Sequence, residues 1–475
     1  MANKLPNILF FMTDQHHAGC LGFAGHPLVK TPNLDRLAAR GAWFRQMFTC
    51  SAICAPSRTS FFTGTYLRTH NHFGNQGDLP RDLPNLASEA KRAGFRTGVC
   101  GKAHLPPRIL RHFDSSQTMT EYHDMLAAEH LTDVDTAPPF HQHFMSAPSK
   151  LPKEKHRITW TGDRAVDFLK AGRTSDQPFF LWCSFDPPHA PHVPSPDMDA
   201  LYRPEYIPID WDEYERFERS RMGKRAMIED FWKVGAVRQN PKIFQQAVCR
   251  YLALITMIDE QVGCVLAALE EQGLADNTIV VFTADHGDFA GHWGQLGKNL
   301  PGYDDLLRIP FIYYDPTRSD HGRCVESLHQ SVDLFPSLWE RLGLPIPPTV
   351  QGQSFLPAID GYPGSSREYI FAETHNVKTV RSEDWKLNFH AVHPHQGQLF
   401  HMGAVPDETT NLWDDPQCAP IKQRLLEAML GWMVRCEQAS AMEIKMEPFI
   451  DTRWYRWLAA QPDQCAVPEP LETHA

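Results

Sequence analysis

Cys54 stands in the stretch Cys54-Ala55-Pro56-Ser57-Arg58, whose residue types could support nucleophilic chemistry on an anion. Proline is favoured in the first turn of a helix, so Pro56 predicts that Cys54 lies at the N-terminus of a short helix. The dipole and the unpaired N–H groups of such a terminus favour a negative charge. Arg58 follows one helical turn later, close enough to hold an anionic group beside Cys54.

Two other interpretations of this stretch compete with an activated nucleophile. A buried cysteine before a proline turn is common in intracellular proteins and needs no chemistry. A phosphatase with a cysteine nucleophile would need an arginine six positions after Cys54, and that position holds Ser60. A structural cysteine therefore stays open as an alternative, whereas a cysteine phosphatase does not.

Polar groups suited to metal binding or proton transfer follow four predicted strands. The strands cover residues 7–12, 97–100, 178–185 and 278–283, and the groups that follow them are, in turn, Asp14-Gln15, Lys102 with His104, His189, and Asp285-His286. Taken alone, each group could simply form a turn after its strand. In an open α/β sheet, however, ligands bind beyond the carboxyl ends of the strands, so we expect one shared site.

The elements that must position these groups alternate along the chain. Short apolar runs are separated by segments of helical periodicity, which predicts an α/β fold with a large, mostly parallel sheet between helices. Thr31-Pro32 marks one helix start, and Gly94 and Gly273 mark two helix ends. The large domain is expected to cover residues 1–362.

The pattern changes after this domain. Four short strands close in sequence indicate an antiparallel sheet, and an amphipathic helix at residues 421–436 follows them. We therefore expect a smaller C-terminal α+β domain (363–438) and a C-terminal tail or arm (439–475). Trp454, Tyr455 and Trp457 in this tail favour docking on a partner, so we expect a homodimer or a larger homo-oligomer.

Composition excludes several classes of protein. The 475 residues carry 46 basic and 57 acidic side chains, a net charge of −11, so no basic surface for nucleic acid is expected. We find no apolar run long enough to span a membrane and no signal peptide. The 11 cysteines are scattered and odd in number, which indicates reduced thiols and a cytoplasmic protein.

Cys-x-Pro-Ser-Arg resembles the signature of the type I, formylglycine-dependent sulfatases of the alkaline phosphatase superfamily, near arylsulfatases and phosphonate monoester hydrolases. Other stretches match the same family in the same order. They are Thr13-Asp14-Gln15, Thr31-Pro32-Asn33-Leu34-Asp35, Gly101-Lys102-Ala103-His104, Pro188-His189-Ala190-Pro191, Thr283-Ala284-Asp285-His286-Gly287-Asp288, Gly297-Lys298 and Val332-Asp333-Leu334-Phe335-Pro336-Ser337. The resemblance covers residues 6–357, with a weaker echo at 399–415, and implies an alkaline-phosphatase-like fold.

The resemblance implies that Cys54 is converted after translation to formylglycine, which requires a maturation enzyme as a partner. The aldehyde hydrates to a geminal diol. One hydroxyl attacks sulfur and expels the alcohol, and the second lets the aldehyde re-form as sulfate leaves. An unmodified cysteine or serine lacks that second hydroxyl, so turnover would stall.

The resemblance also implies one divalent metal ion, held by Asp14, Gln15, Asp285, His286 and an oxygen on modified Cys54. Many sulfatases carry an aspartate where this chain has Gln15, and an asparagine where it has His286. These departures remove a negative charge and add an imidazole, so both Ca²⁺ and Mn²⁺ are candidates.

Six further residues take roles by the same resemblance. Arg58 and Lys102 would hold the diol oxygens, and His104 would be the base for the second hydroxyl. His189 and Lys298 would contact the sulfate, and one of them would protonate the leaving oxygen. Asn75 would line the substrate pocket.

These residues predict a sulfuric ester hydrolase for organic sulfate monoesters, aryl or other small sulfates. The alternative is a phosphonate monoester or phosphodiester hydrolase with the same machinery. The phosphodiester-directed relatives tend to lack the Lys-x-His pair found here at Lys102 and His104, which favours sulfate. A non-catalytic binding protein is a third possibility, disfavoured because Cys54, Arg58 and the metal-ligand types are all retained.

Overall fold

The computed structural model describes residues 5–133, 145–172, 176–220, 240–298, 302–318, 322–362, 366–374, 376–392, 394–403 and 408–441. Its large sheet has eight strands: β1 (Asn7–Asp14), β2 (Ala42–Phe44), β4 (Arg96–Gly101), β5 (Ser115–Thr118), β6 (Phe179–Pro188), β7 (Thr278–Ala284), β8 (Phe311–Tyr314) and β9 (Arg323–Val325). The strand order is β5-β4-β6-β1-β7-β8-β2-β9. All neighbours are parallel except the two pairs that involve β8, which confirms the predicted mostly parallel sheet.

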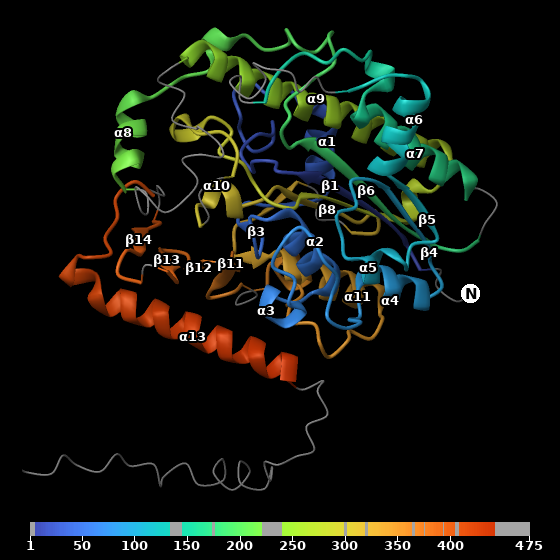
Figure 1. Cartoon of the computed structure of the whole chain (residues 1–475). Helices are drawn as coiled ribbons and strands as arrows, with labels where there is room; N and C mark the ends of the chain where they lie inside the picture. The colour runs from blue at the N-terminus through green and yellow to red at the C-terminus, as the bar shows by residue number, and fades with distance from the viewer. Residues whose placement is uncertain are drawn as a thin grey trace, which may run out of the picture.

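Helices cover both faces of this sheet (Figure 1). The described α-helices are α1 (Pro32–Arg40), α2 (Cys54–Thr63), α3 (Leu67–His70), α4 (Leu86–Arg92), α5 (Pro107–Leu110), α6 (Met119–Ala128), α7 (Arg157–Ala171), α8 (Trp211–Ser220), α9 (Pro241–Glu271), α10 (Asp304–Leu307), α11 (Leu334–Leu342), α12 (Leu356–Asp360) and α13 (Ala419–Ala441). Helices α1, α7 and α9 pack on one face, and α2, α4 and α11 pack on the other.

Strand β1 lies at the centre of the sheet and is buried along its whole length. Side chains alternate along a strand, so Leu9 and Phe11 enter the core under α9, whereas Ile8, Phe10 and Met12 enter the core under α2. A strand buried on both faces is apolar without alternation, which explains the continuous run in the sequence.

Helix α9 is long and apolar enough to cross a membrane by length and composition alone, a property that the sequence expectation missed. In the fold, 72% of that apolar window is buried. It packs against α7 and β6 within the core of the large domain, so its composition is that of a central core helix.

A second sheet follows the large one. Its four antiparallel strands are β11 (Ile370–Glu373), β12 (Val377–Arg381), β13 (Trp385–His390) and β14 (Gln398–His401), in that order, as the sequence predicts. Helix α13 covers this sheet, with Trp432 stacked on Phe371 at 4.9 Å. A small two-stranded sheet joins β3 (Met47–Phe48) and β10 (His329–Gln330).

The predicted boundaries at residues 362/363 and 438/439 stay predictions, although α13 extends to Ala441. The aromatic tail that motivates the predicted oligomer, Trp454 to Trp457, lies outside the described residues.

Helix α2 differs from the other helices because every residue in it is buried. Its hydroxyl side chains all have hydrogen-bond partners: Thr59 and Thr63 donate to carbonyls of the preceding turn, whereas Ser57 donates to the carbonyl of Asp285 and Ser60 bonds to His70. They therefore carry no unsatisfied polar groups into the core. The helix ends at Gly64, which has a left-handed backbone (φ 64°) against Val350 and Phe335. Its first residue is Cys54, as the proline signal predicts.

Candidate active site

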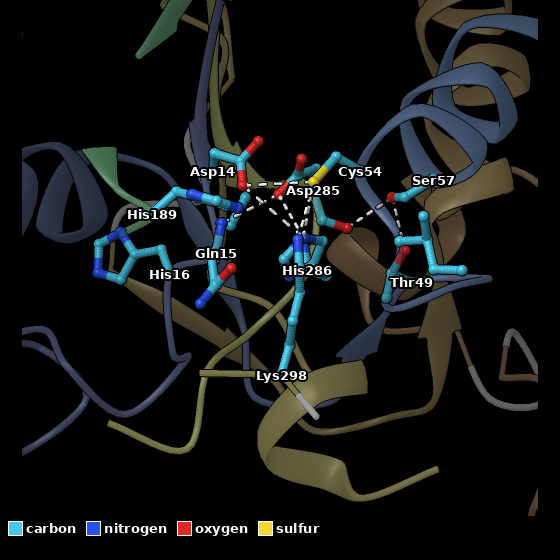
Figure 2. A network of polar contacts seen from close by, with 12 residues as sticks. Asp14, Gln15, His16, Thr49, Cys54, Ser57, His189, Asp285, His286 and Lys298 are labelled. Atoms are coloured by element: carbon cyan, nitrogen blue, oxygen red, sulfur yellow. Dashed lines mark hydrogen bonds and ion pairs between the residues drawn. The ribbon is translucent and has the colours of Figure 1, made fainter. Parts of the chain in front are cut away.

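Four buried side chains converge at the carboxyl edge of the large sheet (Figure 2). One potential ligand atom from each of Asp14, Cys54, Asp285 and His286 lies within 4.8 Å of those of the other three. Asp14 ends β1, Asp285 directly follows β7, and Cys54 begins α2. The site is therefore built at the meeting point of two neighbouring central strands and one helix N-terminus.

Parallel register explains why the two aspartates meet. Thr13 of β1 pairs with Ala284 of β7, so the next residue on each strand is an aspartate at the same level. The backbone N–H of Asp285 donates to the carbonyl of Thr13 at 3.0 Å and continues the ladder by one step. Two carboxylates at this depth require compensating positive charge.

Arg58 supplies that charge. Its side chain is fully buried, and it donates from Nη2 to Asp14 (2.9 Å) and from Nε to Asp285 (2.8 Å). Nη1 donates to the carbonyl of Lys102 and to Ser184 Oγ. Every guanidinium nitrogen thus donates to an oxygen of Asp14, Asp285, Lys102 or Ser184, and none of these hydrogen bonds goes to the Cys54 sulfur.

Cys54 lies among positive groups. Its Sγ is 2.9 Å from Lys298 Nζ and 3.3 Å from His286 Nε2, and 3.6 Å from Asp14 Oδ1. Burial and the Asp14 carboxylate oppose ionisation of the thiol. The surrounding cations, which also include Lys102, outweigh both and hold the pKa of Cys54 well below its usual value.

The pKa values of the two carboxylates are shifted in opposite directions. Burial alone would raise the pKa of Asp14, but Lys102, His189, Arg58 and Lys298 hold it well below its usual value. The pKa of Asp285 is raised, first by burial and then by the negative charge of Asp14. The pair is thus biased so that Asp14 keeps its charge in all but strongly acidic conditions.

Lys102 bridges Asp14 to a residue that the sequence analysis missed. Its Nζ lies 2.9 Å from Asp14 and 2.8 Å from Asp186. Asp186 also accepts from Arg157 at 2.6 Å, and these two cations keep its pKa below the usual range despite burial. A signal existed, since Asp186 is a carboxylate near the end of β6, directly before the Pro-Pro-His sequence of the predicted site.

The other predicted residues surround this cluster. The His189 ring points towards Asp14 and Gln15, and its Nδ1 lies 2.5 Å from the carbonyl of Ala190. His104 has a left-handed backbone (φ 47°), and its Nδ1 is buried with no hydrogen-bond partner among the described residues. Asn75 is exposed and accepts from the N–H of Ala55 at 3.2 Å, so it caps α2 beside Cys54.

The donor set fits a divalent cation with a preference for oxygen and imidazole ligands. Asp14 and Asp285 offer carboxylate oxygens. The Nδ1 of His286 is 2.9 Å from the carbonyl of Gly287, a contact that fixes the ring and leaves Nε2 towards the cluster. Gln15 Oε1 is buried with no hydrogen-bond partner in the described structure, so it too can be a ligand. These residues and Cys54 would hold the ion.

A histidine–aspartate–histidine chain ties the loop after β1 to the segment that leads to Lys298. Asp305 lies 2.9 Å from His17 Nε2 and 2.7 Å from His292 Nδ1. Burial opposes protonation of His292, but Asp305 outweighs it and raises the pKa of His292 to about 9. The charged pair therefore persists at neutral pH.

Comparison with known proteins assigns the family. The family model for sulfatases matches residues 6–344, and the model for the C-terminal region of N-sulphoglucosamine sulphohydrolase matches residues 291–434. The chain belongs to the sulfatase family, a family of sulfuric ester hydrolases, which confirms the resemblance seen in the sequence.

Individual relatives agree with this assignment. An arylsulfatase from Clostridium perfringens is 29% identical over 446 residues, covering 86% of this chain and 90% of its own. A choline-sulfatase from Rhizobium meliloti is 27% identical over 475 residues, covering 90% and 86%. The fold matches that of a phosphonate monoester hydrolase from Silicibacter pomeroyi with a TM-score of 0.78 at 24% identity, over 92% of this chain and 96% of that one.

Replacing the central arginine should destabilise the protein. Arg58→Ala leaves Asp14 and Asp285 buried without their shared cation, at an expected cost of about 3–5 kcal/mol in the free energy of unfolding. Urea unfolding in the presence of a chelator measures this. Arg45→Ala is the matched control, since Arg45 and Glu326 form an exposed pair worth about 0–1 kcal/mol. Equal losses in the two variants would contradict the assigned role of Arg58.

The His292–Asp305 pair should give stability a pH dependence. The pKa of His292 is higher in the folded protein than the usual value near 6.5, so its contribution is complete below about pH 6.5 and is lost as pH rises through about 9. We expect the stability difference between wild type and His292→Gln to shrink between pH 7 and pH 10, measured by urea unfolding. The exposed His123→Gln serves as control. A difference that stays constant over this range would refute the pairing.

Proposed function

We propose that this protein hydrolyses organic sulfate monoesters, aryl or other small sulfates, with a formylglycine made from Cys54 as its nucleophile. The observation that carries the proposal is the position of Cys54, at the N-terminus of a buried helix and within 4.8 Å of two aspartates and a histidine. Sulfatase family membership adds the reaction class.

Two further groups would complete this chemistry, the formylglycine made from Cys54 and a divalent cation. Formylglycine supplies a geminal diol, so that one hydroxyl can attack sulfur and the second can release the sulfate. A divalent cation, Ca²⁺ or Mn²⁺, supplies positive charge that lowers the pKa of the attacking hydroxyl. Formation of the aldehyde implies a formylglycine-generating enzyme as a partner of this chain.

The residues of the chain would have separate roles in this reaction. Asp14, Gln15, Asp285 and His286 would hold the cation. Arg58 pairs with both Asp14 and Asp285 and holds them in place, and Lys102 orients Asp14 from the other side. Because Lys298 Nζ already lies 2.9 Å from the Cys54 sulfur, it is placed to contact an anionic group bound there.

We assign proton transfer to His189 and His104, the two histidines that follow the ends of β6 and β4. His189 points towards the cluster and is our candidate, with Lys298, for protonation of the leaving oxygen. His104 follows Lys102 on the same loop and has an unpaired ring nitrogen in the described structure, so we assign it the proton of the second hydroxyl. Asn75, exposed beside Ala55, is our candidate for substrate contact.

A phosphonate monoester or phosphodiester hydrolase is the second candidate. Sulfate and phosphonate monoesters are both tetrahedral monoanions, and the fold is shared with a phosphonate monoester hydrolase. Lys102 together with His104 favours sulfate, because the phosphodiester-directed relatives tend to lack that pair. Some cross-activity is expected from a site that recognises charge and shape more than the central atom.

Activity on matched substrates tests this assignment. Purified protein loaded with Mn²⁺ or Ca²⁺ should hydrolyse an aryl sulfate with a kcat/KM at least about tenfold above that for an aryl phosphonate monoester, a difference of about 1.4 kcal/mol in transition-state binding. The reverse order would establish the second candidate. Activity on neither substrate would favour a binding protein.

The nucleophile is tested by Cys54→Ala, which should lower kcat by roughly 10³-fold or more because the covalent route disappears. The control is the mass of the wild-type peptide that contains Cys54, which should be about 18 Da below that of the thiol form. Full activity in Cys54→Ala, or in wild-type protein whose peptide is unmodified, would refute the mechanism.

His104→Ala should separate the two halves of the reaction. If His104 acts only on the second hydroxyl, the first turnover stays fast and later turnovers slow by about 10²–10⁴-fold. Stopped-flow detection of the phenol should then show a burst that is absent in wild type. Equal slowing of both phases would assign His104 to the first step and leave release to His189 or Lys298.

A further inference from the structure

Asp288 is a buried carboxylate that none of the roles above uses. It is the last residue of the stretch Asp285-His286-Gly287-Asp288 and is fully shielded from solvent. Its Oδ2 accepts from the side-chain amide of Gln15 at 2.5 Å. Its Oδ1 accepts from the backbone N–H of Ala290 at 2.6 Å, and both oxygens lie close to the N–H of Gly297, at 3.0 and 3.1 Å.

Gln15 is anchored along its backbone as well. Its N–H donates to Asp285 Oδ1 at 3.0 Å, and its carbonyl accepts from the hydroxyl of Tyr251 at 2.9 Å. The residue has a left-handed backbone (φ 60°), an uncommon conformation for glutamine that these two bonds hold. Only rotation about the side-chain bonds therefore remains to decide where the amide oxygen points.

Asp288 fixes the rotation of the Gln15 side-chain amide. A carboxylate accepts hydrogen bonds and cannot donate them, so it must face the nitrogen of the Gln15 amide and not the oxygen. The oxygen is then forced to the opposite side, where it is buried without a hydrogen-bond partner in the described structure. Figure 2 shows the amide nitrogen directed away from Cys54 and the oxygen on the side of His286.

We propose that Asp288 is a positioning residue that holds the Gln15 amide with its oxygen towards the cation site. The inference rests on the proposed metal site and adds to it the reason that a neutral glutamine can act there as an oriented ligand. Through Gly297, the same carboxylate fixes the backbone directly before Lys298, which contacts the Cys54 sulfur. Asp288 thus couples the cation ligand to the group that faces the nucleophile.

An asparagine at position 288 cannot do the same. It has one acceptor oxygen and one donor nitrogen, whereas Asp288 accepts on both sides. If the oxygen stays with Ala290 and Gly297, the new NH₂ group faces Gln15. The glutamine must then turn its oxygen towards position 288 and its nitrogen towards the cation site, where an N–H donor repels a cation.

The direct test is the affinity of chelator-treated protein for Mn²⁺ alone, measured by isothermal titration calorimetry. Asp288→Asn should bind Mn²⁺ about 10- to 100-fold more weakly than wild type, the range found when groups that orient metal ligands are removed. Asp305→Asn is the matched control. It also removes a buried negative charge near this loop, from a carboxylate that bonds His17 and His292 but not Gln15. It should bind Mn²⁺ within about threefold of wild type.

A charge-conserving exchange separates orientation from general damage. In the double variant Gln15→Glu with Asp288→Asn, the asparagine can donate to one oxygen of the new glutamate and leave the other oxygen for the cation. The bond between positions 15 and 288 is kept, with its direction reversed, and so are the bonds from Ala290 and Gly297 to the remaining oxygen and the net charge; only the second contact of Gly297 is lost. We expect this protein to recover Mn²⁺ affinity to within about threefold of wild type, which a merely structural role of Asp288 would not produce.

The outcomes distinguish this inference from the proposed function. No Mn²⁺ or Ca²⁺ binding by wild type would refute the metal site itself. Metal binding by wild type with unchanged affinity in Asp288→Asn, or with an equal loss in Asp305→Asn, would overturn the role of Asp288 alone. Thermal melting shows whether Asp288→Asn folds. If it does not, the double variant Gln15→Glu with Asp288→Asn is the test. A folded double variant that binds Mn²⁺ weakly would also overturn the inference.

Discussion

The ion cluster of Arg58 with Asp14 and Asp285 is the interaction on which the rest of the site depends. All three side chains are fully buried, so each carboxylate would be unstable without the guanidinium. Arg58 can reach both because it lies one turn along α2 from Cys54, and the two aspartates extend the neighbouring strands β1 and β7. The arginine therefore fixes the distance between the helix that begins at Cys54 and the strands that carry the carboxylates.

This cluster explains why α2 is buried on all sides. A helix that presents its N-terminus and an arginine to the centre of the sheet edge cannot keep one face in water. Its remaining surface is packed by α11 and the core beneath the sheet, and its N-terminal N–H groups are met by groups such as Asn75. The fold thus accepts a polar helix in its core because each hydroxyl side chain has a hydrogen-bond partner, inside the helix or on a neighbouring segment, and the arginine is paired.

The sequence made much of this arrangement predictable. Pro56 after Cys54 located the helix start, and the polar residues after four apolar runs located the sheet edge that holds the site. Residues that act through other residues were harder to find. Asp186 lies near the end of β6 and Asp288 ends the stretch that begins at Thr283, but no spacing rule gave either of them a role. Their partners Lys102 and Gln15 are known only from the three-dimensional register. The pairing of His292 with Asp305 likewise depends on a loop path that local pattern does not encode.

The charge balance around Gln15 shows how the site accommodates its departure from the usual family residue. An aspartate at this position would place a third carboxylate within a cluster that already contains Asp14 and Asp285. Here the negative charge lies on Asp288, behind the Gln15 side chain as seen from Asp14 and Asp285. Three N–H groups, from Gln15, Ala290 and Gly297, stabilise it. In the proposed cation site, Gln15 would then offer a neutral oxygen whose orientation Asp288 fixes. Because the nearer charge is lost and the imidazole of His286 is gained, the donor set combines hard oxygens with one nitrogen, a combination that suits Mn²⁺ as well as Ca²⁺.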